Sequence, residues 1–228
     1  MDMNTEEKEQ RVFKNNGKLF EEDLRASFSK HIWTYRPPDT GGGMMARFTQ
    51  ESLCDLMAYN TKTKDFILME LKSTLGTSVN FRTYEECMNY EKQKQEFEDW
   101  VSSLTAEERK KEKENIKQRR KEIKLLYKST NQAMIKYHQI KNLLESKQKY
   151  GIESYILFTF FRNTKTYAIP IENFVEDFWK LTDKKSINMK DLDDLVKKGK
   201  AYAIPQQYIR RTMRSQYDVD FLVEGRKS

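Results

Sequence analysis

The stretch that most constrains the fold is an almost continuous apolar run, Ser154-Tyr155-Ile156-Leu157-Phe158-Thr159-Phe160-Phe161. A run of this kind favours a strand that is buried on both faces, and it is far too short to cross a bilayer. Thr166 to Ile169 follows closely and is expected to pair with it. Because helical patterns alternate with these strands, we predict an α/β protein with a mixed β-sheet flanked by helices.

Other segments extend this assignment over a single domain of residues 1–228. Leu19, Phe20, Leu24 and Phe28 recur at helical spacing and predict a first helix over 18–31, with Glu21, Glu22 and Asp23 near its positive N-terminal end. Strands are predicted over 53–59 and 65–72 as a hairpin, and further helices over 130–148, 171–181 and 190–197. Residues 1–16 are predicted to form a flexible arm, and the segment from Arg36 to Gly43, with Pro37, Pro38 and three glycines, a mobile loop.

Residues 84–128 differ in kind because they contain neither Gly nor Pro and are densely charged. Their first part, 85–99, carries six acids, and their second part, 109–128, carries ten bases. Thr105 with Glu108 between these parts forms a capping-box pattern. We predict an inserted antiparallel helical hairpin, held by a thin apolar seam of Phe97, Trp100, Val101, Leu104, Ile116, Ile123 and Leu126. It is either a solvated, salt-bridged pair of helices or an arm that touches DNA or a second subunit.

The candidate chemistry lies in the predicted strand hairpin. Glu70 and Lys72 project from the same face of one strand, and Asp55 lies in the apolar context of the other. Carboxylates are hard oxygen ligands that suit Mg²⁺, and a lysine beside a phosphodiester can stabilise developing negative charge. Buried acids are rare without a partner or a metal. Glu21 is a further candidate that would bind a second metal or orient water, although helix-dipole charge also explains it. An exposed ion pair at a strand end is the simpler explanation of Glu70 and Lys72.

The overall composition fits a polyanionic partner. The 228 residues include 42 Lys plus Arg against 35 Asp plus Glu, a net charge of +7 and a pI near 9.1. Such an excess favours nucleic acid, although solubility alone is an equal explanation. Two cysteines form no disulfide framework, and the first residues are polar and acidic, so we expect a cytoplasmic protein that does not span a membrane. With only His31 and His138 present, histidine-based hydrolysis is improbable.

In this order the segments resemble the RecU family of Holliday junction resolvases, within the PD-(D/E)xK nuclease superfamily. The resemblance is spread over most of the chain. It is carried by Asn15-Asn16-Gly17 with Phe20-Glu21, by Arg47-Phe48-Thr49-Gln50-Glu51-Ser52 leading to Asp55, by Met69-Glu70-Leu71-Lys72-Ser73, by Tyr137-His138-Gln139-Ile140, and by Phe178-Trp179, Lys185-Ser186-Ile187 and Ile204-Pro205.

The resemblance implies a restriction-endonuclease-like core and a homodimer that cuts four-way DNA junctions in homologous recombination and DNA repair. It implies Mg²⁺ or Mn²⁺ held by Asp55, Glu70 and Gln139, with catalytic roles for Lys72 and for the helix-one acid Glu21. Leu53 stands where the family often has a metal-binding threonine, so that only its backbone carbonyl would serve. DNA contacts are expected from six arginines: Arg36, Arg47, Arg82, Arg210, Arg211 and Arg214.

Two further departures bear on substrate choice. The family's stalk, which precedes the first metal acid, is here reduced to the loop 37–43, while the hairpin 84–128 is extra, and we hypothesise that the hairpin replaces the stalk. Three alternatives stay open at this point. The protein is a nuclease for other branched or duplex DNA, a catalytically silent DNA-binding recombination protein of the same fold, or a helical interaction protein built on the hairpin.

Overall fold

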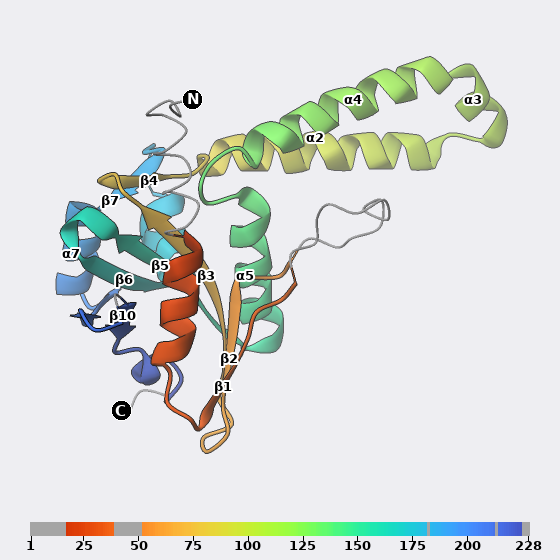
Figure 1. Cartoon of the computed structure of the whole chain (residues 1–228). Helices are drawn as coiled ribbons and strands as arrows, with labels where there is room; N and C mark the ends of the chain where they lie inside the picture. Colours follow the sequence, from red (N-terminus) through yellow and green to blue (C-terminus); the bar gives the residue numbers. More distant parts are fainter. Residues whose placement is uncertain (1–16, 39–51, 182, 213, 225–228) are drawn as a thin grey trace, which may run out of the picture.

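A central mixed β-sheet forms the body of the molecule (Figure 1). The computed structural model describes residues 17–38, 52–181, 183–212 and 214–224, so the predicted arm 1–16 and most of the loop 36–43 lie outside the described residues. The six strands are ordered β1-β2-β3-β5-β6-β8. They are β1 (Ile32–Tyr35), β2 (Leu56–Asn60), β3 (Phe66–Thr74), β5 (Glu153–Phe160), β6 (Lys165–Pro170) and β8 (Tyr202–Ile204). The pair β3–β5 is parallel and the other neighbours are antiparallel, which confirms the predicted mixed α/β fold.

Both faces of this sheet are covered, as the apolar run predicted. Every residue of β5 after Glu153 is buried. On one face Phe20 and Leu24 of the first helix, residues 17–27, belong to a core with Met69 of β3. On the other face Ile140 of α5 (Tyr137–Tyr150) belongs to a core with Ile156 of β5. The sheet therefore separates two apolar cores, and neighbouring residues of β3 enter different ones.

The chain begins with a shorter helix than its apolar spacing predicted. The helix ends at residue 27 rather than 31, and a tight turn in which the Ile32 N–H donates to the Ser29 carbonyl leads into β1. Asp220 captures the turn, because its carboxylate accepts the Ser29 N–H at 3.0 Å. The edge strand β1 then pairs with β2, with Ile32 opposite Asn60. The predicted helix over 18–31 is therefore wrong at its C-terminal end, and β1 was not predicted.

The predicted strand hairpin and the strand after the apolar run are confirmed. β2 and β3 pair antiparallel, and β6 pairs antiparallel with β5. The helix predicted over 171–181 is instead a short α6 (Ile171–Phe174) followed by a π-helical segment, η3 (Val175–Trp179). α5 begins at Tyr137 rather than near residue 130, since the preceding helix runs on to Thr130. α7 (Met189–Lys197) agrees closely with the prediction.

The inserted helical hairpin projects away from the body (Figure 1). It consists of α2 (Tyr84–Ser103), a short α3 (Ala106–Lys111) at the tip, and α4 (Lys113–Thr130). The Thr105–Glu108 capping box is present, and the predicted seam residues are half-buried. At the base, Cys87 and Tyr90 are buried in the body's core. The predicted hairpin is therefore confirmed, and its base is part of the body while its tip is not.

The remaining elements are small. β4 (Ser78–Asn80) pairs with β7 (Ser186–Asn188), and β9 (Gln206–Ile209) pairs with β10 (Arg214–Tyr217). Two 3-10 turns, η2 (Phe161–Asn163) and η4 (Asp220–Leu222), complete the described chain. Within the described ranges no helix combines the length and the apolar character needed to cross a membrane.

Candidate active site

The register of β2 and β3 brings the two predicted metal acids together. Leu56 lies opposite Met69, so the preceding residue, Asp55, comes opposite Glu70. Asp55 lies just before β2 but continues its ladder, because its N–H donates to the Met69 carbonyl at 3.1 Å. The Leu71 N–H in turn donates to Asp55 Oδ2 at 2.8 Å. The carboxylate of Asp55 is therefore fixed beside the middle of β3 by two backbone contacts of one neighbouring strand.

Glu70 is a fully enclosed carboxylate, with 1% of the residue exposed. The alternation of β3 places Glu70 and Lys72 on the face covered by α5, and Lys72 Nζ lies 2.6 Å from Glu70 Oε1. Burial raises the pKa of Glu70 to about 8, the Asp55 carboxylate adds to the rise, and the Lys72 ammonium opposes it. The charge of Lys72 therefore does not fully offset the cost of two neighbouring acids in this enclosed place.

Gln139 joins this pair from α5. Its Nε2 donates to Glu70 Oε1 at 2.5 Å, and its Oε1 accepts the N–H of Lys136, which stands at the N-terminal end of the helix. The predicted grouping of Gln139 with Glu70 is thus present. In this orientation the amide holds the carboxylate through a donor, whereas a metal ligand would use Oε1. A half-turn of the amide would exchange the two atoms, and the ligand role of Gln139 stays a prediction.

Glu21 is engaged elsewhere in the described structure. It is half-buried and forms an ion pair with Arg36, just after β1. The helix that carries it packs on the sheet face opposite α5. The first turn of this helix nevertheless comes close to the end of β3, because a Cβ on Gly17 would lie 3.4 Å from Ser73 Oγ. A catalytic role for Glu21 stays a prediction.

Several of the arginines predicted to contact DNA have partners within the protein. Arg214 pairs with Glu22 at 3.0 Å and with the buried Asp23, so it ties β10 to the first helix. Arg82 Nε donates to the Ser129 carbonyl at 3.0 Å and braces the base of the hairpin. Arg210 and Arg211 lie exposed in the turn between β9 and β10. Arg47 lies outside the described residues, and the side chain of Leu53 is 37% exposed.

Two structural roles were not predicted from the sequence. Asp23 was assigned to the helix dipole, yet it is buried and also accepts the Ser215 N–H at 2.9 Å. His138, next to Gln139, places Nδ1 2.7 Å from Asn131 Oδ1. Asn131 is the residue at which α4 ends, so His138 links the root of the hairpin to the start of α5. The sequence places His138 beside Gln139, which indicates that His138 lies near the site. It does not indicate that Asn131 is the partner of His138.

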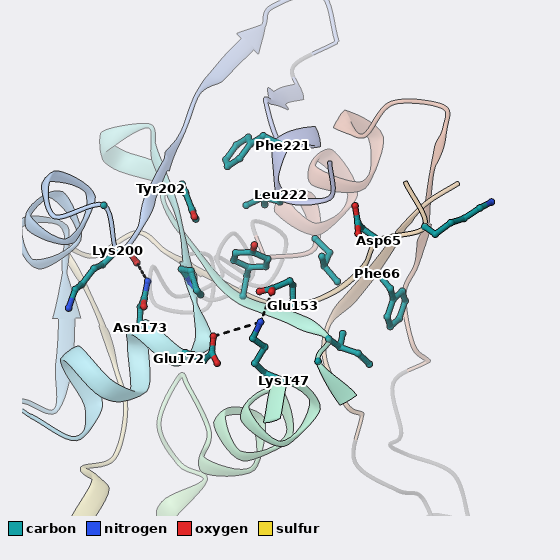
Figure 2. Close-up of a pocket in the computed structure, with 17 residues that line it drawn as sticks. Asp65, Phe66, Lys147, Glu153, Glu172, Asn173, Lys200, Tyr202, Phe221 and Leu222 are labelled. Atoms are coloured by element: carbon teal, nitrogen blue, oxygen red, sulfur yellow. Dashed lines mark hydrogen bonds and ion pairs between the residues drawn. The ribbon is translucent and has the colours of Figure 1, made fainter. Parts of the chain in front are cut away.

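A hollow of about 850 Å³ lies away from these acids, at the beginnings of β3 and β5 (Figure 2). Lys147 projects into it between Glu153 and Glu172 and pairs with both, at 3.8 Å in the case of Glu172. Glu153 and Glu172 share this lysine as an ion-pair partner and are about half exposed, whereas Glu70 is enclosed. Across the described residues, no three His, Cys, Asp or Glu side chains gather in a way that would hold a metal ion. The candidate site thus rests on two carboxylates.

Comparisons with known proteins add little to this geometry. No family model matches the chain, and no curated protein matches it. Among solved structures it is similar to Hjc of Archaeoglobus fulgidus, a Holliday junction resolvase from an archaeal hyperthermophile. The identity is 14%, the TM-score is 0.39, and the match covers 78% of this chain and 92% of that chain. At these values the similarity carries no argument about function, which has to be argued from the site itself.

Proposed function

We propose that this protein is a metal-dependent DNA endonuclease that acts on four-way junctions. The observation that carries the proposal is the enclosed Glu70 carboxylate. It lies opposite Asp55 of the adjacent strand, and its hydrogen-bond partners are Lys72 and Gln139. An acid buried beside a second acid is costly even with one cationic partner, and such pairs of acids are frequent at functional sites. The same set of groups is what phosphodiester hydrolysis requires, namely hard oxygen ligands and a lysine.

The donor set fits Mg²⁺ or Mn²⁺. Mg²⁺ is commonly bound through one or two carboxylates and keeps several waters, so the absence of a third acid among the described residues suits it. Burial raises the pKa of Glu70 to about 8 and the Asp55 carboxylate adds to the rise, and a divalent cation between the two acids would offset both effects. Asp55 and Glu70 would hold the ion, with the Leu53 carbonyl and Gln139 as further proposed ligands. When bound, it would polarise the phosphate and acidify a water.

The protein's own groups then have separable tasks. The Leu71 N–H holds Asp55 in place, and the Gln139 amide holds Glu70. Lys72 is half-buried, so its ammonium acts in a place of reduced dielectric and stabilises negative charge that develops on the phosphate oxygens. In the resting protein Lys72 is paired with Glu70, and a cation between the carboxylates would compete for that partner. We therefore assign Lys72 to charge stabilisation rather than to proton abstraction.

The finer parts of the proposal rest on the family resemblance. It supports a four-way junction as the substrate, a homodimer that makes paired cuts, and a role in recombination and repair in the cytoplasm. The net charge of +7 agrees with a DNA substrate. The extra hairpin and the reduced loop 37–43 are departures that bear on junction selectivity more than on the cleavage reaction.

The first experiment measures cleavage of a labelled mobile four-way junction beside a linear duplex of the same sequence, with Mg²⁺, with Mn²⁺ and with chelator. Wild type is compared with Asp55→Asn and with a matched control, Asp65→Asn, because Asp65 is an exposed acid in the turn that joins β2 to β3. We expect paired cuts in the junction alone, lost with chelator and in Asp55→Asn but kept in Asp65→Asn. Cleavage of both DNAs would indicate a less selective nuclease. Binding without cleavage under either metal would overturn the proposal and indicate a silent DNA-binding protein.

A further inference from the structure

The outer part of the helical hairpin has no role in the core or in the candidate site. Its apolar seam is thin, and Arg119 stacks over the Trp100 ring at 5.3 Å to close it. The ion pairs in this part run along single helices, as in Lys94–Glu98 at 3.9 Å and Lys117–Glu114 at 3.6 Å. The hairpin therefore stands out into solvent as two helices held by a few side chains (Figure 1).

Basic side chains gather on one face of α4. At about 100° per residue, six of them fall within an arc of about 100° and extend over about 22 Å of helix. We call this set the basic stripe: Lys113, Lys117, Arg120, Lys121, Lys124 and Lys128. All six are exposed, and in the described residues only Lys117 among them has an ion pair, with the exposed Glu114. A row of like charges at this spacing is unfavourable by itself, so it selects a partner of opposite charge.

The stripe fits a nucleic-acid backbone better than a protein surface. One strand of a DNA duplex carries a phosphate about every 3.4 Å along its axis, so a 22 Å stripe spans roughly six phosphates. Protein interfaces are rich in aromatic and apolar anchors, and Leu125 is the one exposed large apolar side chain that the structure shows on α4. A regular row of cations with little apolar surface matches a regular row of phosphates.

The root of the hairpin leads directly to the candidate site. Phe81 before α2 and Ile135 after α4 form a bridge, and Trp179 Nε1 donates to the Arg82 carbonyl at 2.8 Å. Asn131 at the end of α4 contacts His138, and the next residue, Gln139, contacts Glu70. Three residues thus connect the base of α4 to the buried carboxylate, and the base itself is fixed to the body.

We infer that the basic stripe binds the phosphate backbone of a duplex arm of the substrate and directs it to the Asp55–Glu70 site. This inference rests on the proposed function, because it takes DNA as the substrate. It adds a surface that neither the acids nor the predicted arginines supply. The hairpin lies in the chain between β3, which carries Glu70, and α5, which carries Gln139. It would therefore place a DNA-binding surface in the connection between two elements of the site.

The test compares two triple variants of equal charge change. Lys117→Gln/Arg120→Gln/Lys124→Gln removes the centre of the stripe, and Lys190→Gln/Lys197→Gln/Lys198→Gln removes three exposed lysines at α7, which Figure 1 shows on the side of the body away from the hairpin. Affinity for a labelled duplex is measured in chelator from about 50 to about 200 mM salt. We expect the stripe variant to bind at least about tenfold more weakly and to lose about 3 from the slope of log K against log salt, with little change in the control. Equal effects in both variants, or none in the stripe variant, would overturn the inference.

A second measurement does not depend on removing charge. Cys54 and Cys87 are buried, and burial raises the pKa of each thiol to about 12, so both react slowly with thiol reagents. Leu125→Cys, next to Lys124, and Tyr150→Cys, at the end of α5, each add one exposed thiol. We expect duplex DNA to slow labelling of Leu125→Cys several-fold and to leave Tyr150→Cys unchanged. Equal protection at both positions, or none at Leu125→Cys, would contradict the inference.

The two proposals fail in different ways. Suppose that wild type cuts junctions, that the stripe variant binds duplex DNA like the α7 variant, and that DNA protects Leu125→Cys no more than Tyr150→Cys. Then only the role of the stripe is overturned. If wild type does not cut but the stripe variant shows its expected loss of binding, the nuclease proposal fails and the stripe is supported as a DNA contact. If wild type binds no DNA at any salt concentration, both proposals are overturned.

Discussion

The candidate site and the helical hairpin hold charge in opposite ways. At the site, Glu70 is 1% exposed and is hydrogen-bonded to Lys72 and Gln139. The six cations of the basic stripe are instead all exposed to solvent. Removing a charge from water costs several kcal/mol, whereas an exposed ion pair contributes about 1 kcal/mol or less. Single substitutions should therefore have large effects in the sheet, while the outer part of the hairpin should respond only to combined changes.

The largest expected effect is on the cleavage rate. It tests whether Lys72 contributes to cleavage without contributing to DNA affinity. Lys72→Met should lower the cleavage rate about 10²- to 10³-fold, because a charge-stabilising group is lost from an enclosed place. DNA affinity should change by less than about threefold, since Lys72 is one cation among many. The control is Lys62→Met, at an exposed lysine in the turn between β2 and β3. A comparable loss of binding in Lys72→Met would mean that the site and the DNA-contact surface are not separate.

Glu70→Gln should reveal the cost of the buried acid. The pKa of Glu70 is raised from 4.5 to about 8, so the folded state holds a proton that the unfolded state releases between these values. The stability of the metal-free protein should then fall as pH rises from about 4.5 to 8. Glu70→Gln removes this loss, so in chelator it should exceed wild type in free energy of unfolding by on the order of 5 kcal/mol above pH 8 and by little at low pH. Urea unfolding at several pH values measures this.

The control for that comparison is Glu176→Gln, at an exposed acid of η3. A difference between wild type and Glu70→Gln that does not grow with pH would contradict the raised pKa of the enclosed Glu70. The same variant should have lost cleavage, so that stability and activity would change in opposite directions at one position.

Substitutions of two aromatic residues compare the base of the hairpin with its outer part. Tyr90 is 7% exposed and packs near Tyr127 and Tyr137, whereas Trp100 is half-buried in the outer seam. Tyr90→Ala should lower the global free energy of unfolding by about 3 kcal/mol, as for other large core side chains. Trp100→Ala should change it by less than about 1 kcal/mol and mainly speed amide exchange at the tip. Equal global losses would show that the whole hairpin folds as one unit with the body.

The smallest effect on the body is expected from removing the tip. Deleting 86–127, which would remove the whole insertion, also removes Cys87 and Tyr90 from the core. A better cut replaces 96–120 with a short glycine linker, which keeps the buried base. We expect a melting temperature within a few degrees of wild type and metal-dependent nicking at low salt, with junction preference lost. Unchanged junction preference would contradict the hypothesis that the hairpin replaces a stalk.

Local patterns in the sequence predicted the elements whose reasons are local. The hairpin follows from a long run without Gly or Pro and from the Thr105–Glu108 box, and β5 follows from its apolar run. β1 was not predicted because its four residues are too few to show a strand pattern between the helix predicted to residue 31 and the loop predicted from Arg36. The hairpin was predicted to end at residue 128, close to the end of α4 at Thr130, but the next helix was predicted from about 130, whereas α5 begins at Tyr137.

The site could be predicted only in part for the same reason. Asp55, Glu70 and Lys72 lie on adjacent strands, so alternation and hairpin pairing were sufficient to bring them together. Gln139 lies 69 positions from Glu70, and it was placed with the acids by family resemblance rather than by spacing. The pairing of Arg214 with Glu22, 192 positions apart, had no local signal, so Arg214 was assigned to DNA although it ties two ends of the chain together.

The bridge between Phe81 and Ile135 has a consequence for how this protein can be altered. A segment whose two ends meet as neighbours imposes almost no distance requirement on what lies between them. Hairpins of other lengths or other charge, or an unrelated small domain with adjacent termini, should be exchangeable at this point like a cassette. Substrate choice would then be open to engineering by module exchange, with the cleavage chemistry left in the unaltered sheet.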